Sequence, residues 1–85
     1  MEIENWINKG QELVREFTFE NQTQLAEFVL MVARFSDEVN HHADMQISQC
    51  RNLRISISTH DQNSLTDLDY KWVIDLNERI KAYNK

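Results

Sequence analysis

Apolar and polar residues alternate along the segment 53–60, a pattern that predicts a β-strand. Positions 53, 55 and 57 face the core, and the even-numbered side chains face the other way, so that His60 emerges on the open side at the strand's end. Residues 45–48 form a shorter candidate strand. Residues 13–19 form another, and the segment 8–11 around the single glycine predicts a hairpin turn before it.

Two stretches carry apolar residues at helical spacing. The first follows a candidate N-cap at Asn21 or Thr23 and has charged residues on its opposite side. The second begins after Thr66, has acidic residues in its first turn and runs to the C-terminus. The apolar stripe of the first helix is Leu25, Phe28, Val29, Val32, Phe35 and Val39, and that of the second is Leu68, Trp72, Leu76, Ile80 and Tyr83.

The order strand, strand, helix, strand, strand, helix predicts an α+β fold with helices covering one face of an antiparallel sheet. The chain has 85 residues. We expect a single domain over residues 1–85. If a chain of this length were divided into two domains, each would bury too small a core.

The first helix has more apolar residues than a one-sided helix needs. Ala26, Leu30, Met31 and Ala33 widen its stripe beyond the roughly 100° that faces a core. A second copy of the chain is the expected cover, since association buries surface that a short chain leaves exposed. We therefore expect a homodimer or homotetramer through the Leu25–Val39 helix.

Composition and charge narrow the classes of function. The net charge of −5 repels a phosphate backbone, so direct binding of nucleic acid is not expected. Neither a signal-peptide pattern nor an apolar run of about 20 residues is visible, and we expect a soluble, cytoplasmic protein. The single cysteine, Cys50, has no partner for an internal disulfide. We interpret it as a small, partly buried side chain.

The chain has only three histidines, and they lie at two places where predicted elements end. His41 and His42 follow the first helix, and His60 stands at the end of the most clearly alternating strand. Imidazole suits proton transfer in both directions near neutral pH, because its unperturbed pKa is about 6.5. The three histidines are therefore candidates for an acid/base set. Carboxylates close to them in sequence are Asp37, which precedes His41 at (i, i+4) spacing, Asp44, Asp61 and Asp69.

Two other interpretations of the histidines stay open. They could be solvated loop residues, or they could bind zinc together with Asp37 or Asp69. Adjacent side chains such as His41 and His42 diverge on a regular backbone, and no HxH or HExxH spacing is present, which disfavours the metal. Nucleophile-elbow, glycine-rich phosphate-loop and CxxC motifs are absent.

Three blocks of the sequence resemble the pterin-4a-carbinolamine dehydratase family. They are Asp37-x-x-x-His41-His42-Ala43-Asp44, Ser58-Thr59-His60-Asp61 and Leu65-Thr66-Asp67-Leu68-Asp69. Residues 13–19 also look like a strand of that family, and the similarity covers about residues 6–80.

The resemblance implies a four-stranded antiparallel sheet with two helices packed on one face. It also implies dimers or tetramers formed partly through the 25–39 helix. The implied activity is that of a hydro-lyase, which dehydrates 4a-hydroxytetrahydropterin to quinonoid dihydropterin. This reaction recycles the tetrahydrobiopterin cofactor of aromatic amino acid hydroxylases. An acid and a base suffice for it, so no metal or cofactor is expected.

The resemblance also implies roles for individual residues. His41 and His60 would form the acid/base pair, with neither assigned as acid or base, and His42 would position the ring. Five residues would lie at the substrate. Thr59 and Asp61 would offer hydrogen bonds to the pterin and Asp37 and Asp69 would orient the imidazoles, with Ala43 in the turn after the histidines.

The sequence departs from the family pattern at several positions. Ala43 replaces a usual proline, Met45 replaces a tryptophan or isoleucine, and Gln49 or Cys50 stands where an aromatic is usual. An altered pocket is therefore expected, because apolar walls hold a flat pterin ring. The spacing from His41 to His60 is longer than in the family pattern, which suggests a bulge or a longer loop near residues 49–52. The family's usual N-terminal helix has no counterpart in the sequence.

A second class of function fits the same fold. Some family members act as dimerisation partners of transcription factors, so the chain could be a non-enzymatic homo-oligomeric scaffold. Retention of all three histidines favours the enzyme, since a scaffold has no physical need for imidazoles at one site. Another pterin as substrate is a third possibility that the sequence does not separate from the first.

Overall fold

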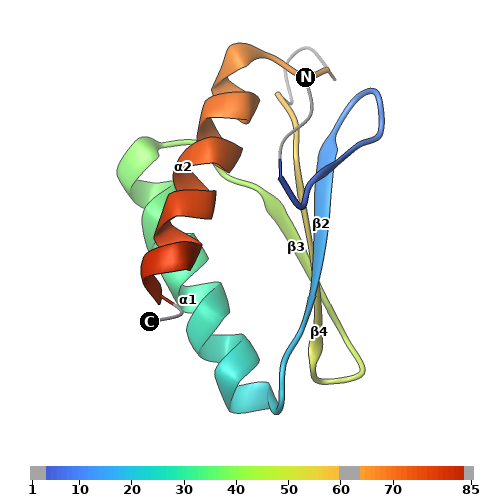
Figure 1. Ribbon diagram of the computed structural model, residues 1–85, viewed down its shortest axis with the longest axis vertical. Helices are drawn as coiled ribbons and strands as arrows, with labels where there is room; N and C mark the ends of the chain where they lie inside the picture. The colour runs from blue at the N-terminus through green and yellow to red at the C-terminus, as the bar shows by residue number, and fades with distance from the viewer. Residues whose placement is uncertain (1–3, 60–63, 84–85) are drawn as a thin grey trace.

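The computed structural model describes residues 4–59 and 64–83. Its helices and strands follow the predicted order (Figure 1). They are β1 (Ile7–Asn8), β2 (Leu13–Thr18), α1 (Gln22–Val39), β3 (Asp44–Ser48), β4 (Asn52–Ile57) and α2 (Asp67–Tyr83).

The four strands form one antiparallel sheet in the order β1-β2-β4-β3. Both helices lie on the same side of this sheet, as Figure 1 shows. The α+β fold expected from the sequence is therefore confirmed. The hairpin around Gly10 is also present, with Asn8 paired to Leu13 and Gly10 at a φ of 91°, which suits a residue without a side chain.

The core lies between the helices and the sheet. From β4 it receives Leu53, Ile55 and Ile57, each at most 1% exposed, which confirms the core face predicted for this strand. The helices contribute four buried apolar side chains each to this layer: Leu25, Phe28, Val32 and Phe35 of α1, and Trp72, Val73, Leu76 and Ile80 of α2.

Strand β4 ends earlier than the alternation predicted. It stops at Ile57, which pairs with Leu13, the first residue of β2. On its other side, β4 pairs as far as Ser56 with Asp44, the first residue of β3. Because these strands run antiparallel to β4, the residues beyond Ile57 lie opposite positions that precede the first residues of β2 and β3. They therefore have no ladder partner in either strand. Thr59 forms only an isolated bridge with Ser64.

Asparagines cap both ends of helix α1. The Asn21 side chain accepts a hydrogen bond from the Gln24 backbone N–H at 2.8 Å, so Asn21 and not Thr23 is the N-cap. Asn40 follows the helix in the left-handed conformation, which asparagine tolerates better than most residues. The backbone N–H groups of Asn40 and His41 both donate to the Ser36 carbonyl. This turn directs His41 away from the helix axis.

Some side chains predicted to be buried are exposed. Val39, Leu68 and Tyr83 belong to the apolar stripes but are 43%, 61% and 43% exposed, because each lies in the first or last turn of its helix. Cys50 is exposed as well, so its interpretation as partly buried was wrong. It lies with Gln49 in a three-residue loop between β3 and β4, where both residues have positive φ. This is the segment in which a longer loop was expected.

The segment before β1 and the character of the two helices bear on two further expectations. Within the described residues, no helix precedes β1. Neither α1 nor α2 combines the length and the apolar character that crossing a bilayer requires.

Candidate active site

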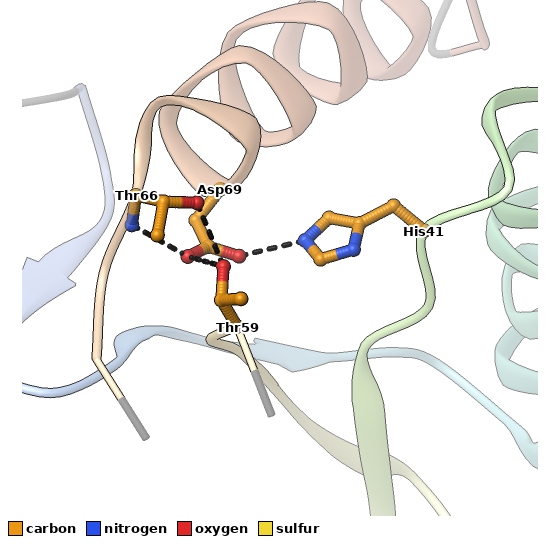
Figure 2. A network of polar contacts seen from close by, with 4 residues as sticks. All are labelled: His41, Thr59, Thr66 and Asp69. Carbon is orange, nitrogen blue, oxygen red and sulfur yellow. Dashed lines mark hydrogen bonds and ion pairs between the residues drawn. The ribbon is translucent and has the colours of Figure 1, made fainter. Parts of the chain in front are cut away.

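His41 and Asp69 meet between the end of α1 and the start of α2, as Figure 2 shows. The His41 Nε2 atom lies 2.7 Å from the Asp69 Oδ1 atom. The Asp69 side chain is fully buried, and the His41 side chain is 19% exposed. The structure thus joins two of the residues that the sequence singled out, 28 positions apart in the chain.

The second oxygen of Asp69 binds two threonines. Its Oδ2 atom accepts hydrogen bonds from the Thr59 hydroxyl and from the Thr66 backbone N–H, each at 2.9 Å. The two threonine hydroxyls lie 2.7 Å apart. The Asp69 carboxylate therefore connects the segment after β4, the start of α2 and the loop after α1.

The start of α2 explains why Asp69 points inward. Thr66 immediately precedes the helix, and Asp69 lies three positions later. A carboxylate at that position can accept from the backbone N–H of the capping residue, which is one half of a capping box. The Thr66 hydroxyl, however, contacts Thr59 and not the helix backbone.

His42 and Asp37 form a second, exposed pair. The His42 Nε2 atom lies 2.8 Å from Asp37 Oδ1, and their side chains are 57% and 76% exposed. From the sequence we expected Asp37 to approach His41 at helical spacing. The structure pairs it with His42 instead, because the left-handed Asn40 ends the helical spacing before His41. The two adjacent histidines thus contact different carboxylates.

The remaining site candidates divide into two groups. Ala43 is half-buried against the core just before β3. His60 and Asp61 lie outside the described residues, so the predicted convergence of three histidines is not visible. Among residues 4–59 and 64–83, no group of three or more metal-ligating side chains is present.

A cleft of about 140 Å³ opens beside His41. Its apolar walls come from Val39, Leu68 and Trp72. Lys71 and Asp75, which form an ion pair at 2.7 Å, complete the lining. The sequence assigned the apolar residues only to helix stripes, because periodicity does not reveal that the end of α1 lies beside the start of α2.

An ion pair holds the two helices together near this cleft. The Arg79 guanidinium binds the Glu38 carboxylate through two hydrogen bonds, of 2.8 and 2.9 Å. These hydrogen bonds lower the pKa of Glu38 and raise the pKa of Arg79. Because the pKa of Glu38 is lowered in the folded state, the pair contributes stability above the ordinary glutamate pKa. That contribution is lost as the pH falls through the folded-state value.

Comparison with known protein families gives a match over most of the chain. The sequence model described as Pterin 4 alpha carbinolamine dehydratase matches residues 1–79. The chain is 34% identical over 83 residues to a protein from Saccharolobus solfataricus, covering 95% of this chain and 84% of the relative. It is 34% identical over 79 residues to one from Metallosphaera sedula, covering 93% and 81%. Both relatives carry the name "Putative pterin-4-alpha-carbinolamine dehydratase".

Two solved structures resemble this fold. One is a transcriptional coactivator/pterin dehydratase from Brucella melitensis, with a TM-score of 0.74, 21% identity and coverage of 88% of this chain and 81% of that chain. The other is a pterin dehydratase-like protein described as a RuBisCO assembly factor in the alpha-carboxysome, with a TM-score of 0.66, 15% identity and coverage of 86% and 83%. At these identities, the likeness concerns the fold alone.

Proposed function

Because this chain belongs to the pterin 4 alpha carbinolamine dehydratase family, we propose that it is a hydro-lyase that converts 4a-hydroxytetrahydropterin to quinonoid dihydropterin. The observation that carries the proposal is the buried Asp69 carboxylate, which holds His41 at the edge of an apolar cleft. An oriented imidazole at the edge of an apolar cleft is suited to proton transfer on a ring bound there.

The chemistry requires two proton transfers. The bond between C4a and the hydroxyl oxygen breaks, the N5–H proton leaves, and a double bond forms between C4a and N5. One group protonates the departing hydroxyl, which leaves as water, and another accepts the N5 proton. In this proposal His41 and His60 are the acid/base pair, His42 positions the ring, and Asp61 hydrogen-bonds to the pterin. We place Thr59 among the residues that hold Asp69, since its hydroxyl already donates there.

The cleft beside His41 is the proposed place for the ring, and Leu68 tests it. Leu68 is 61% exposed, so lysine at this position should leave the fold intact. Loss of one apolar wall is expected to cost about 1–1.5 kcal/mol of binding, or roughly a tenfold increase in KM with kcat unchanged. The measurement is steady-state dehydration kinetics of Leu68→Lys.

Ile74→Lys is the matched control for that variant. Ile74 lies on the same helix and is 46% exposed, but it does not line the cleft. Its KM is expected to equal that of the wild type. Equal KM values for the two variants would place the ring elsewhere.

A stopped-flow assay on synthetic 4a-hydroxytetrahydropterin tests the proposed activity itself. The protein is expected to accelerate appearance of the quinonoid product above the rate in buffer. Absence of acceleration at substrate concentrations well above micromolar would contradict the enzyme and favour the alternative, a non-enzymatic scaffold on the same fold. The network that orients His41 favours the enzyme, because a scaffold does not need an oriented imidazole.

Self-association through α1 is a further part of the proposal. Leu30 is 50% exposed on this helix and Ala26 is exposed as well, so apolar surface remains uncovered in the single chain. Sedimentation velocity at micromolar concentration is expected to show a species of at least twice the 10.2 kDa chain mass. A species of single-chain mass would contradict this part.

A further inference from the structure

The two oxygens of the Asp69 carboxylate have different surroundings, and the difference fixes where the protons are. At Oδ2, the Thr66 backbone N–H can only donate, and the Thr59 hydroxyl also donates. Oδ2 therefore accepts twice and carries no proton. Any proton between Asp69 and His41 lies on the line from Oδ1 to the His41 Nε2 atom, 2.7 Å away.

That proton belongs to the histidine. Both donors at Oδ2 favour the ionised carboxylate, which can only accept, so the group that faces Oδ1 must donate. Nε2 therefore carries the hydrogen and donates it to Oδ1. In a neutral ring with Nε2 protonated, the free lone pair lies on Nδ1. Figure 2 shows Nδ1 on the side of the ring that faces away from Asp69.

Thr66 supports this arrangement at two points without touching His41. Its backbone N–H donates directly to Asp69 Oδ2. Its hydroxyl lies 2.7 Å from that of Thr59, and because the single Thr59 proton goes to Asp69, Thr66 is the donor in that contact. Thr66 thus fixes the rotation of the carboxylate both directly and through Thr59.

From these contacts we infer that His41 exchanges protons with the substrate through Nδ1, and that Thr66 is a positioning residue for that exchange. The inference rests on the proposed dehydration. If His41 is the base, Nδ1 accepts the N5 proton, the N5–H electron pair forms the C4a–N5 double bond, and the hydroxyl leaves as water with a proton from the acid. The imidazolium then formed keeps its Nε2–H on Asp69. If His41 is the acid, Nδ1 donates the proton that leaves with the hydroxyl.

Thr66→Val tests the inference, since it removes the hydroxyl but keeps the shape and the backbone N–H. We expect kcat to fall about tenfold with KM unchanged, because the carboxylate rotates more freely while the cleft is intact. Two-bond ¹H–¹⁵N correlation spectra of the imidazoles are expected to show His41 protonated on Nε2 in the wild type and as a mixture of tautomers in Thr66→Val. His42→Gln and His60→Gln proteins assign the His41 signals.

Thr66→Ser and Thr23→Val complete the set. Serine restores the hydroxyl and is expected to recover most of the rate and the Nε2–H tautomer. Thr23→Val removes an exposed hydroxyl from the first turn of α1 and is expected to change neither. Thr59→Val, which interrupts the same hydroxyl chain, replaces Thr66→Val if that variant does not fold.

Two results would overturn the inference: a neutral wild-type His41 ring protonated on Nδ1 and not on Nε2, or Thr66→Val with the rate and tautomer of the wild type. A wild-type protein that does not dehydrate the pterin would refute the proposed function instead. In that case the tautomer spectra alone would decide whether Thr66 and Asp69 set the protonation of His41.

Discussion

Replacing Asp69 with asparagine is expected to lower the dehydration kcat by about 10²- to 10⁴-fold, the range over which an orienting carboxylate supports a catalytic imidazole. Two donors, the Thr59 hydroxyl and the Thr66 backbone N–H, face Oδ2, so the amide oxygen of asparagine must take that position. The amide NH₂ then faces His41 Nε2, which must become an acceptor. The ring is forced to carry its proton on Nδ1, the wrong tautomer for the proposed reaction.

The matched control for this variant is Asp67→Asn. Asp67 lies in the same first turn of α2 and loses the same charge, but it is exposed and outside the network. Its kcat is expected to stay within about twofold of the wild type, because a solvated charge at a helix start contributes at most about 1 kcal/mol to stability. Stopped-flow turnover of both proteins makes the comparison. Equal rates for the two variants would remove Asp69 from the mechanism.

Removing the His60 imidazole with alanine is expected to reduce turnover by a similar factor, about 10²- to 10⁴-fold. The prediction rests on the sequence, in which His60 follows the best strand and belongs to the Ser58–Asp61 block. If His41 and His60 act in one step, the two substitutions are not additive. The His41→Ala/His60→Ala double variant is then expected to fall only roughly tenfold below the slower single variant.

Single-turnover dehydration, with and without added imidazole, separates chemistry from binding in these variants. Added imidazole is expected to restore part of the rate of His60→Ala, because it can replace the missing proton carrier. A His60→Ala protein as fast as the wild type would exclude His60 from the acid/base pair. It would leave the role of His41 to be judged by its own variant.

The fold was predictable because the patterns that specify it are local. Alternation identified the buried face of β4, helical spacing identified the cores of α1 and α2, and Asn21 was recognised as a candidate cap. The errors lie at the ends of elements. The length of β4 depends on where β2 and β3 begin, and the exposure of Leu68 depends on the position of its helix turn relative to the sheet.

The site was predictable in its residues but not in its pairings. The sequence marked His41 and Asp69 as candidates, but periodicity does not show which carboxylate meets which imidazole, and Asp37 was expected beside the wrong histidine. Thr66 was recognised only as the residue after which the second helix begins. Its second contact, with Thr59, comes from a bridge between segments that flank the undescribed residues 60–63. The cleft walls depend on how two helix ends approach each other in space.

Asp69 has two structural roles, and they bear on which residues a protein of this fold can lose when it loses activity. The same carboxylate binds the backbone at the start of α2 and the imidazole of His41. A descendant that loses catalysis and survives as a scaffold is still under selection to keep Asp69 and Thr66, because its helix needs them. It is free to lose His41. Among homologues on this fold, retention of the aspartate therefore says little about activity, and the histidine is the residue to compare.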